Sequence, residues 1–154
     1  MSTLFVDTIN EKTSGNGVNI PGHVVQIVEA EYSTQTDVAS GDYADLGLSV
    51  TITPKSSSRK IYVITNVQGY VNGQGLLGVR VMRGSTEVVQ ASRALGYQDN
   101  AAGMVALTKL DAPSTTSATT YKIQINHLAI SSGTTIRVNQ GNGGSRITVM
   151  EIAQ

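Results

Sequence analysis

Three aspartates around one loop are the first candidates for chemistry in this sequence. Asp37, Asp42 and Asp45 lie in and beside the segment Val38-Ala-Ser-Gly-Asp-Tyr-Ala-Asp45. Carboxylate oxygens are the ligands that Ca²⁺ takes in proteins. The spacing of these three residues matches no standard calcium loop, so a solvated turn is the favoured interpretation. The sequence predicts no metal site.

The other side chains with catalytic or metal-binding potential are scattered along the chain. His23 and His127 have no second histidine or carboxylate two or four residues away, which favours structural, hydrogen-bonded histidines. Glu29 and Glu31 fall on one face of a predicted strand, but a glycosidase pair would also need a cleft and two different environments. There is no Gly-x-Ser-x-Gly segment and no cysteine nucleophile. We therefore predict no catalytic residues and no enzymatic activity.

One glycine-rich segment could be read as a nucleotide site. Gly73-Gln-Gly-Leu-Leu-Gly78 matches the Gly-x-Gly-x-x-Gly pattern of dinucleotide-binding proteins. That site requires a helix after the last glycine, because the amides of the helix N-terminus hold the pyrophosphate. Val79-Arg-Val-Met-Arg83 has the pattern of a strand instead. A glycine-rich bend is the favoured interpretation, and no cofactor is predicted.

Composition limits the class of protein further. The 154 residues suit one domain, and hydrophobic residues at 40% can build its core. The net charge is zero and no basic cluster occurs, which argues against a nucleic-acid partner. No apolar run reaches the roughly 18 residues that span a membrane, and no secretory signal is visible. We expect no membrane insertion, and synthesis and assembly in a cytoplasm.

The hydrophobic pattern has a period of two, which is typical of strands. Leu48, Val50 and Ile52 alternate with polar residues, as expected for a sheet with one solvated face. Arg83-Gly-Ser-Thr86 predicts a hairpin turn. Strands are predicted at about residues 23–32, 46–53, 60–71, 76–83, 86–91, 103–110, 119–128, 134–139 and 146–152. This succession predicts an all-β fold, a jelly-roll-like β-sandwich.

The segment from residue 61 to residue 67 is apolar on both sides of the predicted strand. It predicts a central strand that is covered on both faces. The residues expected to be buried in it are Ile61, Val63, Ile64 and Val67.

The chain is predicted to divide into an extended N-terminal arm, residues 1–22, and a β-sandwich domain, residues 23–154. The arm is too short to form a core, so it should lie on the domain, on another copy or on a partner. Two loop tyrosines, Tyr43 and Tyr97, could contact a partner surface, for example by stacking on sugars, although ordinary loop anchors are favoured. The apolar residues expected to act in attachment and oligomerisation are Leu4, Phe5, Val6, Ile9, Val18 and Ile20.

Several segments resemble a known family in their amino-acid sequences and in their order along the chain. They are Leu48-Ser-Val-Thr-Ile-Thr-Pro-Lys-Ser-Ser-Ser-Arg-Lys-Ile-Tyr-Val63, the stretch 107–126 with Leu110-Asp-Ala-Pro113 and Tyr121-Lys-Ile-Gln124, and Arg146-Ile-Thr-Val-Met-Glu-Ile-Ala153. Together they resemble a β-sandwich domain common at the C-termini of tailed-bacteriophage fibre proteins. The opening segment 4–18 is similar to a head segment of such phage proteins. Residues 68–106 depart most from this pattern.

The resemblance implies a structural virion protein of a tailed bacteriophage, a homotrimer displayed on the particle exterior and assembled in the host cytoplasm. Its implied partners are copies of itself and either the major capsid protein or tail proteins. Two locations are open, a capsid decoration (cement) protein and a tail fibre or spike tip that binds a host receptor such as a carbohydrate. The short arm, with no shaft before the domain, makes decoration the preferred expectation. A stand-alone carbohydrate-binding module would need sugar-stacking aromatic residues, which are scarce.

Overall fold

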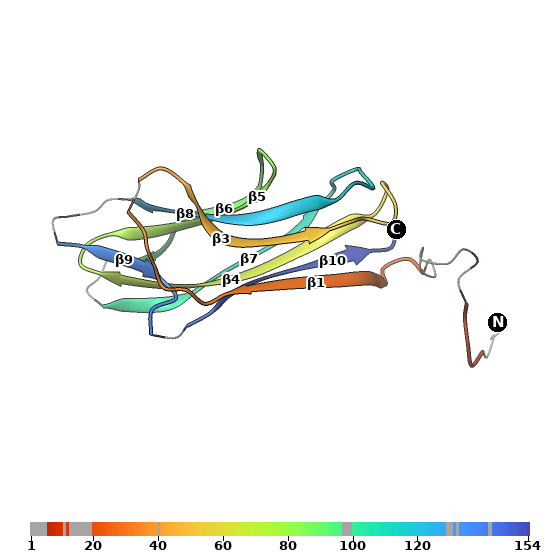
Figure 1. The fold of residues 1–154 in the computed structure, drawn as a ribbon, viewed down its shortest axis with the longest axis horizontal. Coiled ribbons are helices and arrows are strands. Elements are labelled where there is room, and N and C mark those ends of the chain that lie inside the picture. The colour runs from red at the N-terminus through yellow and green to blue at the C-terminus, as the bar shows by residue number, and fades with distance from the viewer. Residues whose placement is uncertain are drawn as a thin grey trace.

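The structure, a computed structural model, describes residues 6–10, 12, 20–39, 41–96, 100–128, 131, 133–141 and 143–154. Within these residues the chain is all-β and forms two sheets that pack face to face (Figure 1). The described residues contain no helix of the length and apolarity needed to cross a membrane. The strands are β1 (Val24–Tyr32), β2 (Thr36–Asp37), β3 (Ala44–Ile52), β4 (Lys60–Asn72), β5 (Leu76–Arg83), β6 (Thr86–Gly96), β7 (Ala101–Asp111), β8 (Thr119–Leu128), β9 (Thr135–Val138) and β10 (Ser145–Ile152).

The strand pairing is that of a jelly roll. The first long strand pairs with the last, β1 with β10, and the next pairs inward are β3 with β8, β4 with β7 and β5 with β6. All four pairs are antiparallel, so the chain is a long hairpin wound into two sheets, which is the double Greek key of the jelly roll. The four-stranded sheet has the order β3-β8-β5-β6. This confirms the predicted fold class.

The six-stranded sheet has four strands across its width. Strand β7 pairs with one edge of β4 along its whole length, while β10 and β9 pair with successive lengths of the other edge. Strand β1 lies beside β10, and the short β2 lies beside β9. The sheet therefore reads β1-β10-β4-β7 at one end of the sandwich and β2-β9-β4-β7 at the other.

Alternate side chains along each strand fill the space between the sheets. In β3, Leu48, Val50 and Ile52 are buried and the residues between them are exposed. The core consists mainly of aliphatic residues, and Tyr121 is its one aromatic residue among those described. Burying each large apolar side chain contributes about 1.5–3 kcal/mol, so this inner face supplies most of the drive to fold.

The prediction for β4 is correct in position and wrong in coverage. The strand is central in its sheet, and Ile61, Val63 and Val67 are fully buried on its inner face. Ile64 is only half-buried, because it lies on the outer face, which no described element covers. A central position gives a strand two neighbours in its sheet without placing a layer on both of its faces.

The other predicted strands are found with small differences in their ends. Strand β6 continues to Gly96, five residues past its predicted end, and β2 was not predicted. The hairpin between β5 and β6 is confirmed, with Gly84 at a φ of +59° in the first central position. The glycine-rich segment is a bend followed by strand β5, as predicted.

The base of the arm is fixed to the C-terminal end of the sandwich. The amide of Gly22 donates to the carbonyl of Ala153, and the amide of Ala153 donates to the carbonyl of His23, both at 2.9 Å. The amide of His23 also donates to Ile20 (3.0 Å). These bonds extend the β1–β10 pairing by one step. The division at residue 22 itself stays a prediction.

Candidate functional site

Asp111 ties the two sheets together at one end of the sandwich. Its carboxylate accepts hydrogen bonds from Nε (2.7 Å) and Nη2 (3.3 Å) of Arg83 and from the hydroxyl of Tyr121 (2.7 Å). Asp111 ends β7 of the six-stranded sheet, whereas Arg83 and Tyr121 are register partners on β5 and β8 of the other sheet. A bidentate guanidinium–carboxylate contact is strong and has a specific geometry. The cluster therefore fixes the distance between the sheets.

Tyr121 is held in its neutral form by this arrangement. Burial of the ring and hydroxyl is the main cause, and the hydrogen bond that the hydroxyl donates to Asp111 adds to it. Both raise the pKa of Tyr121 far above its ordinary value. The hydroxyl thus serves as a permanent donor to the carboxylate.

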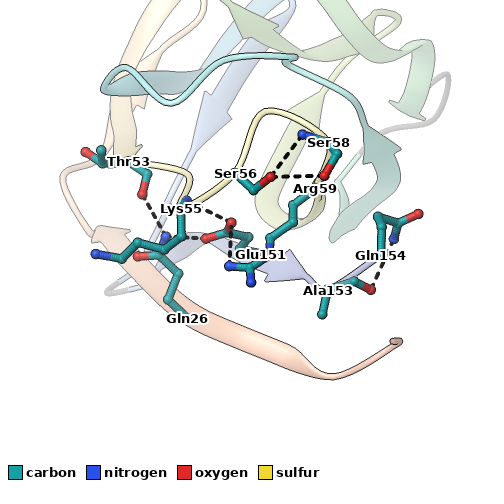
Figure 2. Close-up of polar contacts among 9 residues, drawn as sticks. All are labelled: Gln26, Thr53, Lys55, Ser56, Ser58, Arg59, Glu151, Ala153 and Gln154. Carbon is teal, nitrogen blue, oxygen red and sulfur yellow. Dashed lines mark hydrogen bonds and ion pairs between the residues drawn. The ribbon is translucent and has the colours of Figure 1, made fainter. Parts of the chain in front are cut away.

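Glu151 forms a second polar cluster, shown in Figure 2. Its side chain is fully buried, and its carboxylate accepts from the amide of Lys55 (2.8 Å), from Nε2 of Gln26 (2.5 Å) and from Nη1 of Arg59 (3.4 Å). Nε2 of Gln26 also donates to the carbonyl of Thr53 (2.8 Å). The cluster joins β1, β10 and the loop between β3 and β4, and it closes the end of the core.

The two clusters lie in one row across the inner face of the six-stranded sheet. The register runs from Gln26 on β1 to Glu151 on β10, Ile61 on β4 and Asp111 on β7. The three body segments that carry the family resemblance therefore meet at one end of the sandwich. Glu151 and Asp111 in these segments have a structural role that was not predicted from the sequence. The sequence signal that could have identified this role is the position of Glu151. It comes two residues after the buried Val149 and therefore lies on the inward face of the same strand.

Of the aspartates considered for calcium, Asp37 and Asp45 line one surface pocket but have different partners, and Asp42 is exposed. Asp37 pairs with Arg137 (2.8 Å), and Asp45 accepts from Lys122 (2.9 Å) and Gln124 (2.6 Å). The hydrogen bonds from Lys122 and Gln124 lower the pKa of Asp45. Within the part of the chain that the structure describes, no three His, Asp or Glu side chains form a group that could hold a metal ion.

The paired glutamates lie on an exposed strand face, in line with the favoured interpretation. Glu29 accepts from the hydroxyl of Thr148 (2.8 Å) and Glu31 pairs with Arg146 (3.2 Å), both across the β1–β10 pair. His127 is half-buried in β8, on the other sheet. Neither glutamate shares a site with a histidine.

Tyr43 packs on the outer face of the four-stranded sheet and is half-buried. The guanidinium of Arg80 lies 4.1 Å from the centre of its ring, so one face of the ring is covered by a cation. Burial raises the pKa of its hydroxyl, against the opposing effect of Arg80. Gly78 makes this packing possible, because a Cβ there would collide with Asn126 and lie 3.1 Å from the Tyr43 hydroxyl. A surface contact by Tyr43 stays a prediction, and Tyr97 lies outside the described residues.

An apolar row crosses the outer face of the six-stranded sheet. The register places Ile27 on β1 beside Met150 on β10, then Tyr62 on β4 and Leu110 on β7. Ile27 is 58% exposed and Leu110 is 46% exposed, while Met150 and Tyr62 are half-buried. Ile64 lies in the adjoining row. An apolar row that crosses four strands at the surface is typical of a protein contact.

The arm adds a second set of exposed apolar side chains. Val6 is 52% exposed and Ile9 is 57% exposed, and Ile20 is half-buried near the base. In Figure 1 the red segment of residues 6–10 lies beyond the end of the sandwich where β1 begins, away from both sheets. The attachment role of the arm stays a prediction. Three of its predicted residues lie outside the described part of the chain: Leu4, Phe5 and Val18.

Comparisons with known proteins find weak similarity to chains of two virus structures. No protein-family model matches this sequence, and no curated protein matches it. A chain from the structure of infectious bursal disease virus, Gx strain, is similar with a TM-score of 0.47 and 12% identity over 84% of this chain. A chain of the virus-like particle of the extra small virus of the giant freshwater prawn Macrobrachium rosenbergii gives 0.20 and 15% over 96% of this chain.

The lengths of the compared chains differ. The present chain spans 37% of the bursal disease virus chain and 95% of the extra small virus chain. Because both TM-scores are below 0.5, the jelly-roll assignment rests on the strand pairing alone. That fold is shared by viral capsid domains, lectin domains and cupins.

Proposed function

We propose that this protein is a non-enzymatic structural component of the exterior of a tailed-bacteriophage virion, where it forms a homotrimer. The observation that carries the proposal is the pair of exposed apolar features, the row from Ile27 to Leu110 and the arm residues Val6 and Ile9. Both features suit contact with another protein, and the buried or half-buried acids Glu151 and Asp111 are engaged in structural hydrogen bonds. The jelly-roll fold and the sequence resemblance support a virion role.

Capsid decoration is the location we favour. The row from Ile27 to Leu110 and the arm residues Val6 and Ile9 are exposed, apolar and extended. Such surfaces suit attachment to a shell or to another copy. Tyr43, the described aromatic residue considered for receptor contact, already has one ring face covered by Arg80. In this proposal the arm attaches and oligomerises the protein, and the sandwich is displayed outward. The partner in attachment is the major capsid protein.

A tail fibre or spike tip is the second candidate. The outer face of the four-stranded sheet favours it, because Asp45, Lys122 and Gln124 form a connected, partly exposed group of donors and acceptors there. Such a face suits the hydroxyl groups of a host-surface carbohydrate. The resemblance to fibre proteins points the same way.

Two measurements test the proposal. Light scattering should give 48.6 kDa, three times the chain mass of 16.2 kDa. Antibody-labelled electron micrographs of virions, with the copy number per particle, should place the protein on the shell at a copy number comparable to the shell subunits. Labelling at the tail alone, with few copies, would favour the second candidate. Absence from purified virions would contradict both.

A further inference from the structure

The edges of the sandwich are protected unequally. Strands β1, β3 and β6 are edge strands whose pairing is interrupted by register shifts, between Val24 and Gln26, between Asp45 and Ser49, and at two places opposite β5. Bulges of this kind keep an edge from pairing with another chain. Strand β7 is the exception, since it pairs with β4 through eleven consecutive residues without a shift.

The side chains of β7 give its edge little protection beyond one lysine and one inward-facing aspartate. The strand contains no proline, and its charged residues are Lys109 and Asp111. Asp111 points inward to Arg83 and Tyr121, which leaves Lys109 as the exposed charge. Met104 is 56% exposed and Leu110 is 46% exposed. Among the described strands, β7 pairs with β4 alone. Strand β6 of the other sheet packs close to β7 but forms no ladder with it, so the second edge of β7 has backbone donors and acceptors without a strand partner.

The arm offers a segment that suits this edge. Val6, Thr8 and Ile9 are residues with a high preference for strands. Val6 and Ile9 are exposed, as are all described residues from 6 to 10. Asp7 has the charge opposite to that of Lys109, the exposed charge of β7. The base of the arm lies at the end of the sandwich where β7 finishes, because Glu151, Ile61 and Asp111 share one row there.

We propose that residues 6–10 of the arm add as a strand to the free edge of β7 of a second copy. The inference rests on the proposed role of the arm in oligomerisation and names the surface that receives it. A second copy is favoured because the arm leaves from β1, at the opposite edge of the same sheet, and extends away from its own sandwich (Figure 1). Each copy then gives one arm and receives one. Such a head-to-tail contact forms a ring when the rotation between copies closes, and the proposed homotrimer sets the ring at three copies.

This arrangement covers both unprotected features with one contact. Main-chain hydrogen bonds would satisfy the edge of β7, and the apolar arm side chains would lie beside Met104 and Leu110. Pairing of β7 with β7 of another copy would satisfy the edge and leave the arm exposed. The arm is therefore the occupant of this edge.

Disulfide trapping tests the contact directly, because the chain has no cysteine of its own. The double variant Val6→Cys/Ala106→Cys should form covalent species at multiples of 16.2 kDa on mild oxidation. Because the register of the arm against β7 is not fixed in advance, Met104→Cys and Thr108→Cys, on the same face of β7, are each tested in place of Ala106→Cys. The matched control is Val6→Cys/Ser92→Cys, since Ser92 is exposed on the bulged edge strand β6. The control should stay monomeric on the gel.

The single variants decide the occupant. Cross-linking of Ala106→Cys alone would mean that β7 pairs with β7, and would overturn the proposal. If the double variant loses both thiols but stays at 16.2 kDa, the disulfide has formed within one copy. The arm then folds back on its own sandwich, and the proposal is overturned.

A charge on the edge gives an independent test. Ala106→Lys should abolish the 48.6 kDa species at micromolar concentration, three times 16.2 kDa, while Ser92→Lys should retain it. Both side chains are exposed, so both variants should fold with the circular dichroism of the native protein. A trimer that survives Ala106→Lys and shows no cross-link overturns this inference and leaves the proposed function standing. A native protein that is monomeric contradicts the trimer of the proposed function as well.

Discussion

Glu151 and Asp111 link segments that lie far apart in the sequence. A buried carboxylate without partners is strongly unfavourable, and removing one member of a buried pair typically costs 3–5 kcal/mol. Glu151 is tolerated because it accepts from Lys55, Gln26 and Arg59. Each acid thus requires donors from distant parts of the chain, and the segments that supply them depend on one another.

Both acids fall in segments that stand out in the sequence, but their partners could not be predicted from it. Asp111 was part of a noted segment, but its partner Arg83 is 28 residues away and belongs to the other sheet. Local spacing carries no information about a contact between sheets. The same limit applies to Arg80 over Tyr43, a contact that depends on how a loop folds over β5.

Tyr121 gives a prediction in alkaline solution. Its pKa is raised in the folded protein by burial first and by Asp111 second, so the unfolded chain loses this proton first. The contribution to stability is complete below the ordinary tyrosine pKa of about 10 and is lost as the pH rises above it. We expect the melting temperature of the native protein to fall more steeply above that pH than the melting temperature of Tyr121→Phe. Parallel pH profiles for the two proteins would contradict the prediction.

At the scale of elements, strand positions could be predicted because alternation is a local signal. Strand β2 was missed because two residues cannot show a period, and the last five residues of β6 include Ala94, Leu95 and Gly96, which do not alternate. The coverage of β4 could not be predicted. A strand that is apolar on both sides reads the same whether its outer face meets a second layer, a neighbouring subunit or solvent.

The two faces of β4 give the second prediction. Val63→Ala leaves a cavity in the core and should cost roughly 1–3 kcal/mol of unfolding free energy. Ile64→Ala is the matched control on the outer face and should cost about 1 kcal/mol or less, although it removes more atoms. Denaturant unfolding of both variants under conditions where the protein is monomeric measures the difference. A larger loss for Ile64→Ala would show that the outer face is the buried one.

For the whole molecule, the jelly roll brings distant features to one end of the sandwich. The base of the arm, the Glu151 cluster, the Asp111 cluster and the last residues of β7 meet there, because the first strand pairs with the last. The class of fold could be predicted from the spacing of strands. Which segments lie at this end of the sandwich depends on which strands pair, and local spacing does not show that. The strand pairing places the base of the arm at the end of the sandwich where β7 finishes.

Removal of the arm is the prediction at this scale. Deletion of residues 2–20 keeps Gly22 and His23, whose backbone bonds to Ala153 close the β1–β10 pair, and takes away the exposed Val6 and Ile9. We therefore expect a sandwich that unfolds at nearly the native temperature but neither forms the trimer nor joins the particle. Light scattering and co-purification with virions measure the two losses. The double variant Val6→Ser/Ile9→Ser should weaken both in the same direction, and Thr8→Ser, at an exposed position between them, should leave both unchanged. If the truncated chain is still found on virions at its normal copy number, attachment lies in the sandwich, and the apolar row from Ile27 to Leu110 becomes the surface to test.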